Sequence, residues 1–230
     1  MSGLGWKRPA PGAWRPRRRE AFLAHPGRAL VEAAALLALV GLLAFFVPAG
    51  PLSFDRRWSE LMQDIQTPAL KHVALVFDAL GRGFWRGLAL AVIGLALMVA
   101  RRWAALIAFA VAEALTPLLG NLIKALVARG RPPGHMLTPH GSSFPSGHAA
   151  YAAATAVALV FLFTQPSRKR LLSFGLAALV IAGMAWSRTY LQVHWLSDVL
   201  AGASLGIAAT LGSFGIVQLV VNRSAQREAG

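Results

Sequence analysis

Six long apolar runs constrain the fold of this chain more than any other feature of its sequence. An α-helix needs about 20 mostly apolar residues to cross about 30 Å of bilayer hydrocarbon, and several of the runs approach that length. Their apolar residues cover every side of a helix, whereas a helix of a soluble domain needs only one apolar stripe. The runs cover residues 29–47, 84–100, 104–128, 148–163, 171–186 and 196–221. We therefore expect an all-α integral membrane bundle of six transmembrane helices, without a β-sheet of consequence.

The segment between the first two runs has a different pattern, in which charged residues alternate with apolar residues at helical spacing. The apolar positions are Trp58, Leu61, Met62 and Ile65 in a first stretch and Leu70, Val73, Phe77 and Leu80 in a second. Between them, Pro68 suits the first turn of a helix. The pattern predicts two amphipathic helices at the membrane interface. The second is also long enough for a short, tilted membrane span, and the sequence leaves that alternative open.

The expected domain organisation follows from these runs. Residues 1–28 are polar and rich in Pro, Gly and Arg, which predicts a basic tail with no packed fold. Residues 29–222 would form the six-span membrane domain, with 48–83 as its extracytoplasmic amphipathic segment. Residues 223–230 would form a second short tail. An even number of spans places both tails on the same side of the membrane.

Positive charge indicates which side that is. The N-terminal arginines, Arg101, Arg102, the basic 168–170 segment and Arg223 all fall on one face of the predicted bundle. Lys and Arg accumulate on the cytoplasmic side of membrane proteins. We therefore expect both termini in the cytoplasm and the loops around 129–147 and 188–197 outside it. The compact layout, with no clear organelle signal, fits a bacterial inner membrane.

The net charge of +14 raises the question of nucleic-acid binding. Most of the Lys and Arg residues lie just beyond the ends of apolar runs, where they orient helices and contact anionic lipid headgroups. The bilayer, and not nucleic acid, is therefore the expected partner. The chain also has no cysteine, which excludes disulfides, a thiol nucleophile and cysteine-ligated zinc.

Three polar clusters lie at span ends on the predicted extracytoplasmic face. The first is Lys124 followed by Arg131 and Pro132. Two cations at a helix end can be snorkelling side chains, but this face is the one that is usually depleted in positive charge.

The second cluster, residues 143–148, opens the fourth run. Ser146 is a natural N-cap, and His148 follows it closely. The first turn of a helix offers free N–H groups and a positive dipole end, which together favour a phosphate. The simpler interpretation is a capped helix with an interfacial histidine.

The third cluster joins Ser187 and Arg188 to His194 and Asp198. His194 and Asp198 are four residues apart, a spacing that places side chains on one helix face if the helix begins before His194. A carboxylate that binds one imidazole nitrogen leaves the other available as a nucleophile. Arg188 has to reach the site from the end of the fifth span or from the loop. An Asp–His pair that simply satisfies itself at the interface is the simpler interpretation.

Together the clusters place two histidines, one carboxylate, three cations and a helix N-terminus on one face. This combination of residues suits phosphoryl transfer, in which catalysis depends on positioning the reacting groups and on stabilising the charge of the phosphate oxygens. The residues alone do not decide which histidine attacks, although Asp198 favours His194.

In order, spacing and placement the clusters resemble the three signature motifs of the type-2 phosphatidic acid phosphatase superfamily. The motifs are Lys124-x6-Arg131-Pro132, Pro145-Ser146-Gly147-His148 and Ser187-Arg188-x5-His194-x3-Asp198. The resemblance covers residues 124–198, and the first half of the chain matches only in its general layout of helices. It implies a lipid phosphatase that acts on a phosphomonoester or diphosphate such as undecaprenyl diphosphate, phosphatidic acid or phosphatidylglycerophosphate.

The resemblance also implies a role for each matching residue. His194 would be the nucleophile that takes the phosphoryl group, and Asp198 would orient it. His148 would protonate the departing lipid oxygen and then help to activate water. The phosphate oxygens would be bound by Lys124, Arg131, Ser146, Gly147 and Arg188.

No metal or other cofactor is expected. Asp198 is the single carboxylate of the constellation, whereas a magnesium-dependent phosphatase would have more oxygen ligands. A phosphotransferase that passes the group to an acceptor lipid stays open, because the motifs describe only the first half-reaction. A non-catalytic lipid-phosphate binder is disfavoured by the intact histidines. The lipid tail, the number of phosphates and the oligomeric state are not indicated.

Four further ionisable residues are left without an assigned role. Glu32 and Glu113 lie within apolar runs, where an ionisable group is a functional hypothesis by default. His135 and His140 lie in the Gly- and Pro-rich loop beside the second cluster.

Overall fold

The computed structural model describes residues 21–47, 50–138, 140–165 and 170–227. This part of the chain forms eight α-helices and contains no strand, which confirms the all-α prediction. Most of the predicted basic tail, Arg168, Lys169 and the last three residues lie outside the described ranges. The helices are α1 (Pro26–Phe46), α2 (Ser53–Asp64), α3 (Pro68–Gly81), α4 (Gly83–Val99), α5 (Trp103–Leu126), α6 (Gly147–Phe163), α7 (Arg170–Tyr190) and α8 (Leu196–Arg227).

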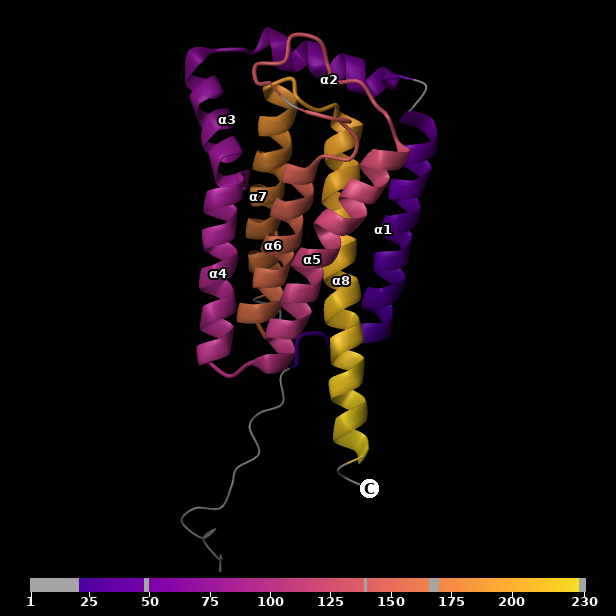
Figure 1. Cartoon of the computed structure of the whole chain (residues 1–230), viewed down its shortest axis with the longest axis vertical. Coiled ribbons are helices and arrows are strands. Elements are labelled where there is room, and N and C mark those ends of the chain that lie inside the picture. The colour runs from indigo at the N-terminus through magenta and orange to yellow at the C-terminus, as the bar shows by residue number, and fades with distance from the viewer. Residues whose placement is uncertain (1–20, 48–49, 139, 166–169, 228–230) are drawn as a thin grey trace, which may run out of the picture.

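The centre of the bundle is α8, which packs against α1, α5 and α6 (Figure 1). Its contact with the start of α6 depends on Gly202, where an added Cβ atom would lie 2.3 Å from the Ser146 carbonyl oxygen. Small residues let two membrane helices approach this closely. The approach brings the first turn of α8 against the start of α6, so that the backbone N–H of Ser146 donates to the Asp198 carbonyl at 2.9 Å.

The outer surface of the bundle is apolar. Phe45 on α1, Val99 on α4, Leu126 on α5 and Leu172 on α7 are each more than 70% exposed. Soluble monomers rarely expose contiguous apolar surface on this scale. Together with the length of the helices, this surface supports a membrane protein.

Within the described ranges, four helices are long and apolar enough to cross a membrane, namely α1, α5, α7 and α8. A fifth crossing results if α3 and α4, which meet at a bend of 54°, count as one broken span. α6 is apolar but shorter, with 17 residues. The number of six spans therefore stays a prediction.

The helix α2 crosses one end of the bundle (Figure 1), and the side that it turns inward is partly polar. It buries Asp55, Ser59 and Met62, whereas Leu61 and Ile65 of the predicted apolar face are exposed. The reason is that Asp55 accepts a hydrogen bond from Ser197 in the first turn of α8, and Ser59 donates one to Gln192 in the connection between α7 and α8.

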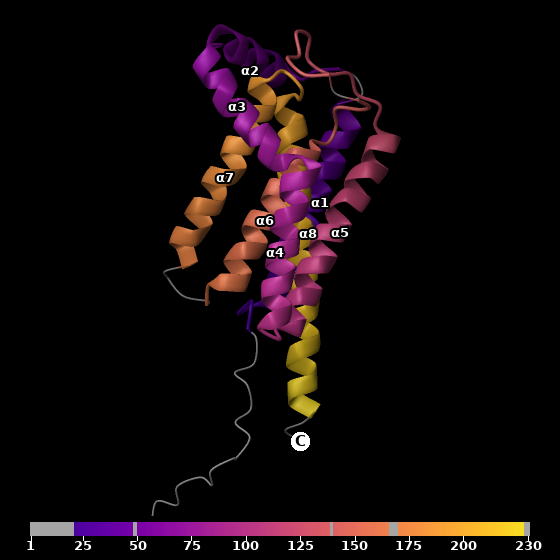
Figure 2. The same ribbon diagram turned by 60° about the vertical axis from the view of Figure 1, so that its left-hand side comes forward.

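The helix α3 does not continue along that end but runs down the side of the bundle. It packs against α7 and leads through its bend into α4 (Figure 2). Its buried residues are Ala74 and Asp78. This placement agrees better with the alternative of a short, tilted span than with a second helix lying flat at the interface.

The start of α1 and the end of α8 lie at the same end of the bundle, opposite α2 and the α5–α6 and α7–α8 connections (Figures 1 and 2). α8 continues to Arg227, beyond the predicted end of the membrane domain at residue 222.

Candidate active site

The three predicted clusters meet at the end of the bundle that α2 covers (Figure 1). The residues come from the last turn of α5 (Lys124), the loop after it (Arg131), the start of α6 (Ser146, Gly147, His148), the last turn of α7 (Arg188), the loop before α8 (His194) and the first turn of α8 (Asp198). The charges of Lys124 and Arg131 act on His194. The charges of Arg188 and His194 in turn act on His148. The structure thus brings all of the sequence-predicted site residues into one group.

His194 faces Asp198, although not through the helical spacing that the sequence predicted. α8 begins only at Leu196, so His194 lies in the preceding loop. Asp198 instead reaches back from the first turn of α8, where its Oδ2 accepts the Trp195 N–H at 2.8 Å, as the third residue of a capping box does. The same Oδ2 lies 3.5 Å from His194 Nδ1. This arrangement leaves Nε2 as the nitrogen free for chemistry.

Burial lowers the pKa of His194 to about 4, because a charged imidazole is poorly solvated there. The hydrogen bond and negative charge of Asp198 oppose this shift, whereas the positive charges of Arg131 and Lys124 add to it. An imidazole with such a pKa is neutral at pH 7 and keeps a lone pair for nucleophilic attack.

We expect the His194 imidazole to remain neutral as the pH falls from 7 to 5 and to take up a proton only near pH 4, where its pKa lies. Nitrogen-15 NMR of histidine-labelled protein in detergent micelles measures this directly, and His194→Ala identifies the resonance. A titration midpoint above pH 6 would contradict the neutral nucleophile.

Two buried carboxylates flank Arg129, a residue that the sequence motifs did not single out. Its Nη1 donates to Asp198 Oδ1 at 2.5 Å, and its Nη2 donates to Asp55 Oδ2 at 2.7 Å. The backbone N–H and hydroxyl of Ser197 also donate to Asp55, at 2.8 and 2.7 Å. No more than 2% of the side chain of Arg129, Asp55 or Asp198 is exposed. A buried charge is stable only when it is paired, so this network fixes the Asp198 carboxylate and fastens α2 onto the site.

The start of α6 presents polar groups that have weak internal partners. Ser146 occupies the N-cap position, as predicted, but its hydroxyl makes no capping hydrogen bond. Oδ1 of Asp78 on α3 lies 3.6 Å from His148 Nε2, which is too far for a hydrogen bond. The Ser146 hydroxyl is therefore available to a bound molecule.

Two of the cations tie the α5–α6 loop around the site. Lys124 Nζ donates to the Ser142 carbonyl at 2.9 Å, and Arg131 Nη1 donates to the Val193 carbonyl at 2.6 Å. These are neutral acceptors, so the two positive charges remain uncompensated by them. An anion at this place would find both cations already directed by the loop.

Several buried polar atoms of this site lack a hydrogen-bond partner. Within the described ranges they include Nε of Arg131, Oγ of Ser146 and Nε of Arg188. Nε2 of His148 and Nδ1 of His194 also make no hydrogen bond of ordinary length, but they face the Asp78 and Asp198 carboxylates at 3.6 and 3.5 Å. Folded proteins pair the great majority of their buried polar groups. These unpaired atoms therefore indicate a ligand site, and an anion rich in oxygen atoms would satisfy its N–H and O–H donors.

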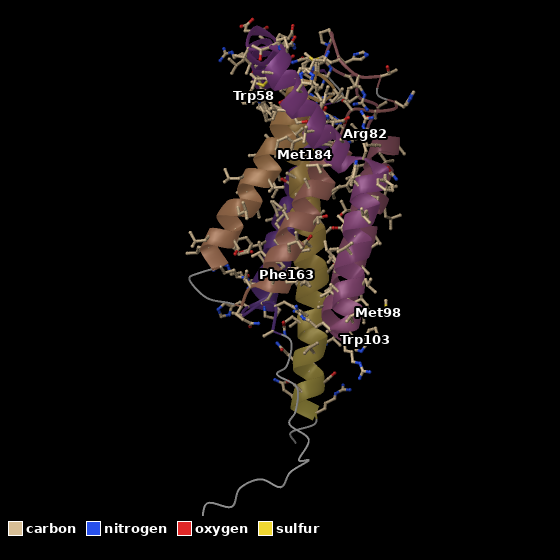
Figure 3. All side chains as sticks on the ribbon, turned by 90° about the vertical axis from the view of Figure 1, so that its left-hand side faces the viewer. Trp58, Arg82, Met98, Trp103, Phe163 and Met184 are labelled. Carbon is tan, nitrogen blue, oxygen red and sulfur yellow. The ribbon has the colours of Figure 1, made fainter. Side chains whose placement is uncertain are left out.

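An apolar cavity of about 530 Å³ lies between α3, α4, α6 and α7. It extends from Met184 of α7 to Phe163 of α6, which Figure 3 shows at different heights of the bundle. Gly81 lines the cavity and also lies against His148, because an added Cβ atom would be 2.3 Å from the imidazole Cδ2. The cavity thus lies next to the polar site at Gly81.

None of the four residues without an assigned role contributes its side chain to the polar site, although the backbone carbonyl of His140 accepts a hydrogen bond from Arg131 Nη2 at 3.0 Å. Glu113 pairs with Arg86 at 2.9 Å and accepts a hydrogen bond from Thr155 at 2.6 Å. Glu32 pairs with Arg28 on the exposed face of α1. The side chains of His135 and His140 are exposed. Glu113 therefore has the partner that the sequence could not name, and it joins α4, α5 and α6.

The sequence motifs do not identify three residues of the site, namely Asp55, Asp78 and Arg129. The sequence carried weak signals for two of them. Arg129 stands two positions before Arg131 in the same basic motif, and Asp78 follows Phe77 on a helix whose inward face was expected to be apolar.

The PAP2 superfamily model matches residues 105–221 of the chain. Among solved structures, a transmembrane PAP2-type phosphatidylglycerolphosphate phosphatase from Bacillus subtilis has a similar fold, with a TM-score of 0.62, 23% identity, and coverage of 89% of this chain and 98% of the other. LpxE from Aquifex aeolicus has a TM-score of 0.56 and 24% identity over 74% of this chain and 96% of the other. At these identities the likeness concerns the fold alone.

Curated relatives match over shorter stretches. An undecaprenyl-diphosphatase from Sulfolobus acidocaldarius is 39% identical over 95 residues, 38% of this chain and 43% of the relative. Phosphatidylglycerophosphatase B from Bacillus subtilis is 33% identical over 95 residues, 39% of this chain and 47% of the relative. A decaprenylphosphoryl-5-phosphoribose phosphatase from Mycobacterium tuberculosis is 39% identical over 97 residues, 40% of this chain and 49% of the relative. The matched region spans less than half the length of each relative.

Proposed function

Because this chain belongs to the PAP2 superfamily, we propose that it is a membrane lipid phosphatase that works through a phosphohistidine on His194. One observation carries the proposal. Buried polar atoms of Arg131, Ser146 and Arg188 that lack hydrogen-bond partners lie in one site with the facing side chains of His194 and Asp198, and an apolar cavity lies next to this site at Gly81.

In the first step, Nε2 of neutral His194 attacks the phosphorus atom. The bond between phosphorus and the lipid oxygen breaks, and protonated His148 gives its proton to that oxygen. The products are a phosphohistidine and a lipid alcohol, or a lipid monophosphate when the substrate is a diphosphate. Asp198, held by Arg129, keeps the His194 ring in place and stabilises the positive charge that develops on it.

In the second step, a water molecule attacks the phosphorus of the phosphohistidine. Neutral His148 takes a proton from this water, and the P–N bond breaks with its electron pair returning to His194. Inorganic phosphate leaves, His148 is protonated again and His194 is neutral, so the enzyme is ready for another cycle.

The phosphate oxygens are bound by cations and helix-terminal donors. Lys124, Arg131 and Arg188 supply positive charge around the phosphorus, and the Ser146 hydroxyl and Gly147 N–H supply donors at the start of α6. Each such donor contributes most when it is aimed at charge that develops in the transition state. Removing one is expected to lower kcat by roughly 10²–10³-fold.

The apolar cavity supports a lipid as the substrate. A ligand whose phosphate reaches His148 has the cavity beside it, because Gly81 lies against His148 and lines the cavity. The cavity wall is built almost entirely of apolar side chains, among them Leu159, Leu176 and Val180. An alkyl or polyprenyl tail is the part of a lipid phosphate that such a wall accommodates.

Filling the cavity should separate long from short substrates. Ala156→Trp places an indole in the cavity lining, and we expect kcat/KM for a long-chain lipid phosphate to fall roughly 10–200-fold, the scale on which an apolar pocket discriminates. For a phosphate ester with a short chain the value should stay within about threefold. Ala178→Trp, on the exposed face of α7, is the matched control. Equal losses of kcat/KM for both chain lengths would show that the cavity does not bind the lipid chain.

We further propose that the site faces away from the cytoplasm, in a bacterial inner membrane. The α4–α5 connection, which contains Arg101 and Arg102, and the end of α8, which contains Arg223, lie at the end of the bundle opposite α2 (Figure 1). Positive residues favour the cytoplasmic side. The substrate headgroup would then enter from the outer leaflet. In this arrangement α2 lies along the extracytoplasmic interface.

Phosphate release from detergent-solubilised lipids tests the proposed function. The panel contains undecaprenyl diphosphate, phosphatidic acid and phosphatidylglycerophosphate, each assayed with a chelator present. We expect turnover of at least one lipid that persists in chelator. Loss of turnover in chelator would contradict the metal-independent reaction. A folded protein that releases no phosphate from any of them would contradict hydrolysis, and renewed turnover on adding acceptor lipids would then favour a phosphotransferase.

A further inference from the structure

The carboxylate of Asp78 is buried at the edge of the site, and no step of the proposed reaction uses it. Only 4% of its side chain is exposed. Oδ1 accepts a hydrogen bond from Arg188 Nη1 at 2.7 Å and lies 3.6 Å from His148 Nε2. Oδ2 pairs with Arg82 at the end of α3. One carboxylate thus binds the cation of α7 and lies beside the imidazole of α6.

The His148 ring is also held sterically by α3. A Cβ atom on Gly81 would lie 2.3 Å from Cδ2 and 3.1 Å from Nε2 of His148. Gly81 and Asp78 are three residues apart, so they stand on the same face of the helix. α3 therefore provides a flat contact for the ring and a carboxylate at one of its nitrogens.

The arrangement parallels the one around the other histidine. Asp198 faces Nδ1 of His194 and leaves Nε2 for the phosphorus atom. Asp78 faces Nε2 of His148 and leaves Nδ1 to exchange a proton with the substrate. A carboxylate next to one imidazole nitrogen fixes the orientation of the ring and stabilises its protonated form.

We propose that Asp78 is a positioning residue that holds the imidazole of His148 for proton transfer. This proposal rests on the proposed function. In the first step the Nδ1–H bond of His148 breaks, the proton goes to the departing lipid oxygen, and the electron pair stays on Nδ1. In the second step Nδ1 takes a proton from the attacking water. Arg188 anchors the carboxylate in place through both steps.

This role makes the importance of Asp78 depend on the leaving group. An alkoxide is a poor leaving group and needs the proton from His148, whereas p-nitrophenolate leaves without one. Loss of general acid catalysis costs roughly 10²–10⁴-fold where the proton is needed. A residue that only stabilised the fold would affect both substrates alike.

The test measures the first step in single-turnover experiments with phosphatidic acid and with p-nitrophenyl phosphate, using the full-length protein in micelles. For Asp78→Asn we expect the rate with phosphatidic acid to fall on the order of 10²-fold and the burst of p-nitrophenolate to change less than about threefold. In a His148→Ala background, Asp78→Asn should have little further effect, because coupled residues are not additive.

Asp64→Asn, which changes an exposed carboxylate of α2, is the matched control and should behave as the wild type. If Asp78→Asn does not fold, Asp78→Glu keeps the charge but displaces the carboxylate, and it should show the same substrate dependence at smaller size. Equal losses for both substrates, or full additivity with His148→Ala, would overturn the assignment. A wild type that is inactive on every lipid phosphate would overturn the proposed function and the role of Asp78 with it, whereas the first two outcomes leave the proposed function intact.

Discussion

Replacing Arg129 with methionine is expected to lower the free energy of unfolding by about 3–5 kcal/mol, the usual cost of removing one partner from a buried ion pair. The guanidinium lies between Asp55 and Asp198, and all three side chains are almost completely buried. Without Arg129, the buried Asp55 loses its ion-pair partner and the buried Asp198 loses the cation that hydrogen-bonds to it. Methionine has a similar volume, so the loss reports mainly the charge. Denaturant unfolding of the protein in mixed micelles measures the change.

The same substitution should also remove most of the phosphatase activity under conditions in which the protein is still folded. Asp198 loses the hydrogen bond that Arg129 donates at 2.5 Å, and α2 loses the ion pair that fastens Asp55 to the site. Arg56→Met, an exposed arginine on α2, serves as the control for loss of positive charge. A variant at Arg129 that unfolds and turns over like the wild type would show that the network is dispensable.

Replacing His194 with alanine is expected to produce the largest loss of activity. Removal of an attacking nucleophile can lower kcat on the order of 10⁶-fold. The fold should be little affected, because the imidazole makes no hydrogen bond shorter than its 3.5 Å contact with Asp198. Steady-state phosphate release with the preferred lipid measures the effect, and thermal unfolding shows whether the variant is folded.

The control for this variant is His72→Ala, an exposed histidine of α3 that lies outside the proposed site. It should retain wild-type turnover. If His194→Ala keeps more than about a tenth of the activity, the nucleophile is another group and the assignment of the two histidines has to be reversed or abandoned. Removal of a true nucleophile leaves far less activity than this.

The positions of the long helices could be predicted because a long apolar run permits few other structures. The run at 104–128 became α5, Trp103–Leu126, and the run at 148–163 became α6, Gly147–Phe163. The sequence could also predict that the site residues lie together. Each cluster stands at the end of a span, and the alternating direction of the spans places those ends on one face. Neither inference needs any knowledge of how the helices pack.

The contacts inside the site depend on packing, and these could not be predicted. α7 was expected to end near Trp186, but it continues to Tyr190 and buries Ser187 and Arg188. A charged residue usually marks the end of a membrane helix. Arg188 is buried within α7 because Asp78 of α3 supplies a buried counter-ion. The two residues lie 110 positions apart in the sequence, so no local sequence pattern connects them.

The network around Arg129 illustrates the same limit. Asp55, Arg129 and Asp198 come from three separate parts of the chain, and each has an ordinary local explanation. Asp55 accepts the N–H of Leu52 at the start of α2, and Asp198 accepts the N–H of Trp195 at the start of α8. Sequence can indicate such capping interactions, but it does not show that two capped helix starts share one arginine.

The proposed mechanism requires a phosphate that is covalently attached to His194. The direct measurement is rapid alkaline quenching of the enzyme after mixing with a lipid whose transferable phosphate carries a phosphorus-32 label. We predict labelled protein at early times, with the label stable in alkali, lost in acid and located on the peptide that contains His194, and no labelled protein in His194→Ala. Release of labelled phosphate within one turnover, with no label ever on the protein or with the label on another residue, would contradict the proposed mechanism.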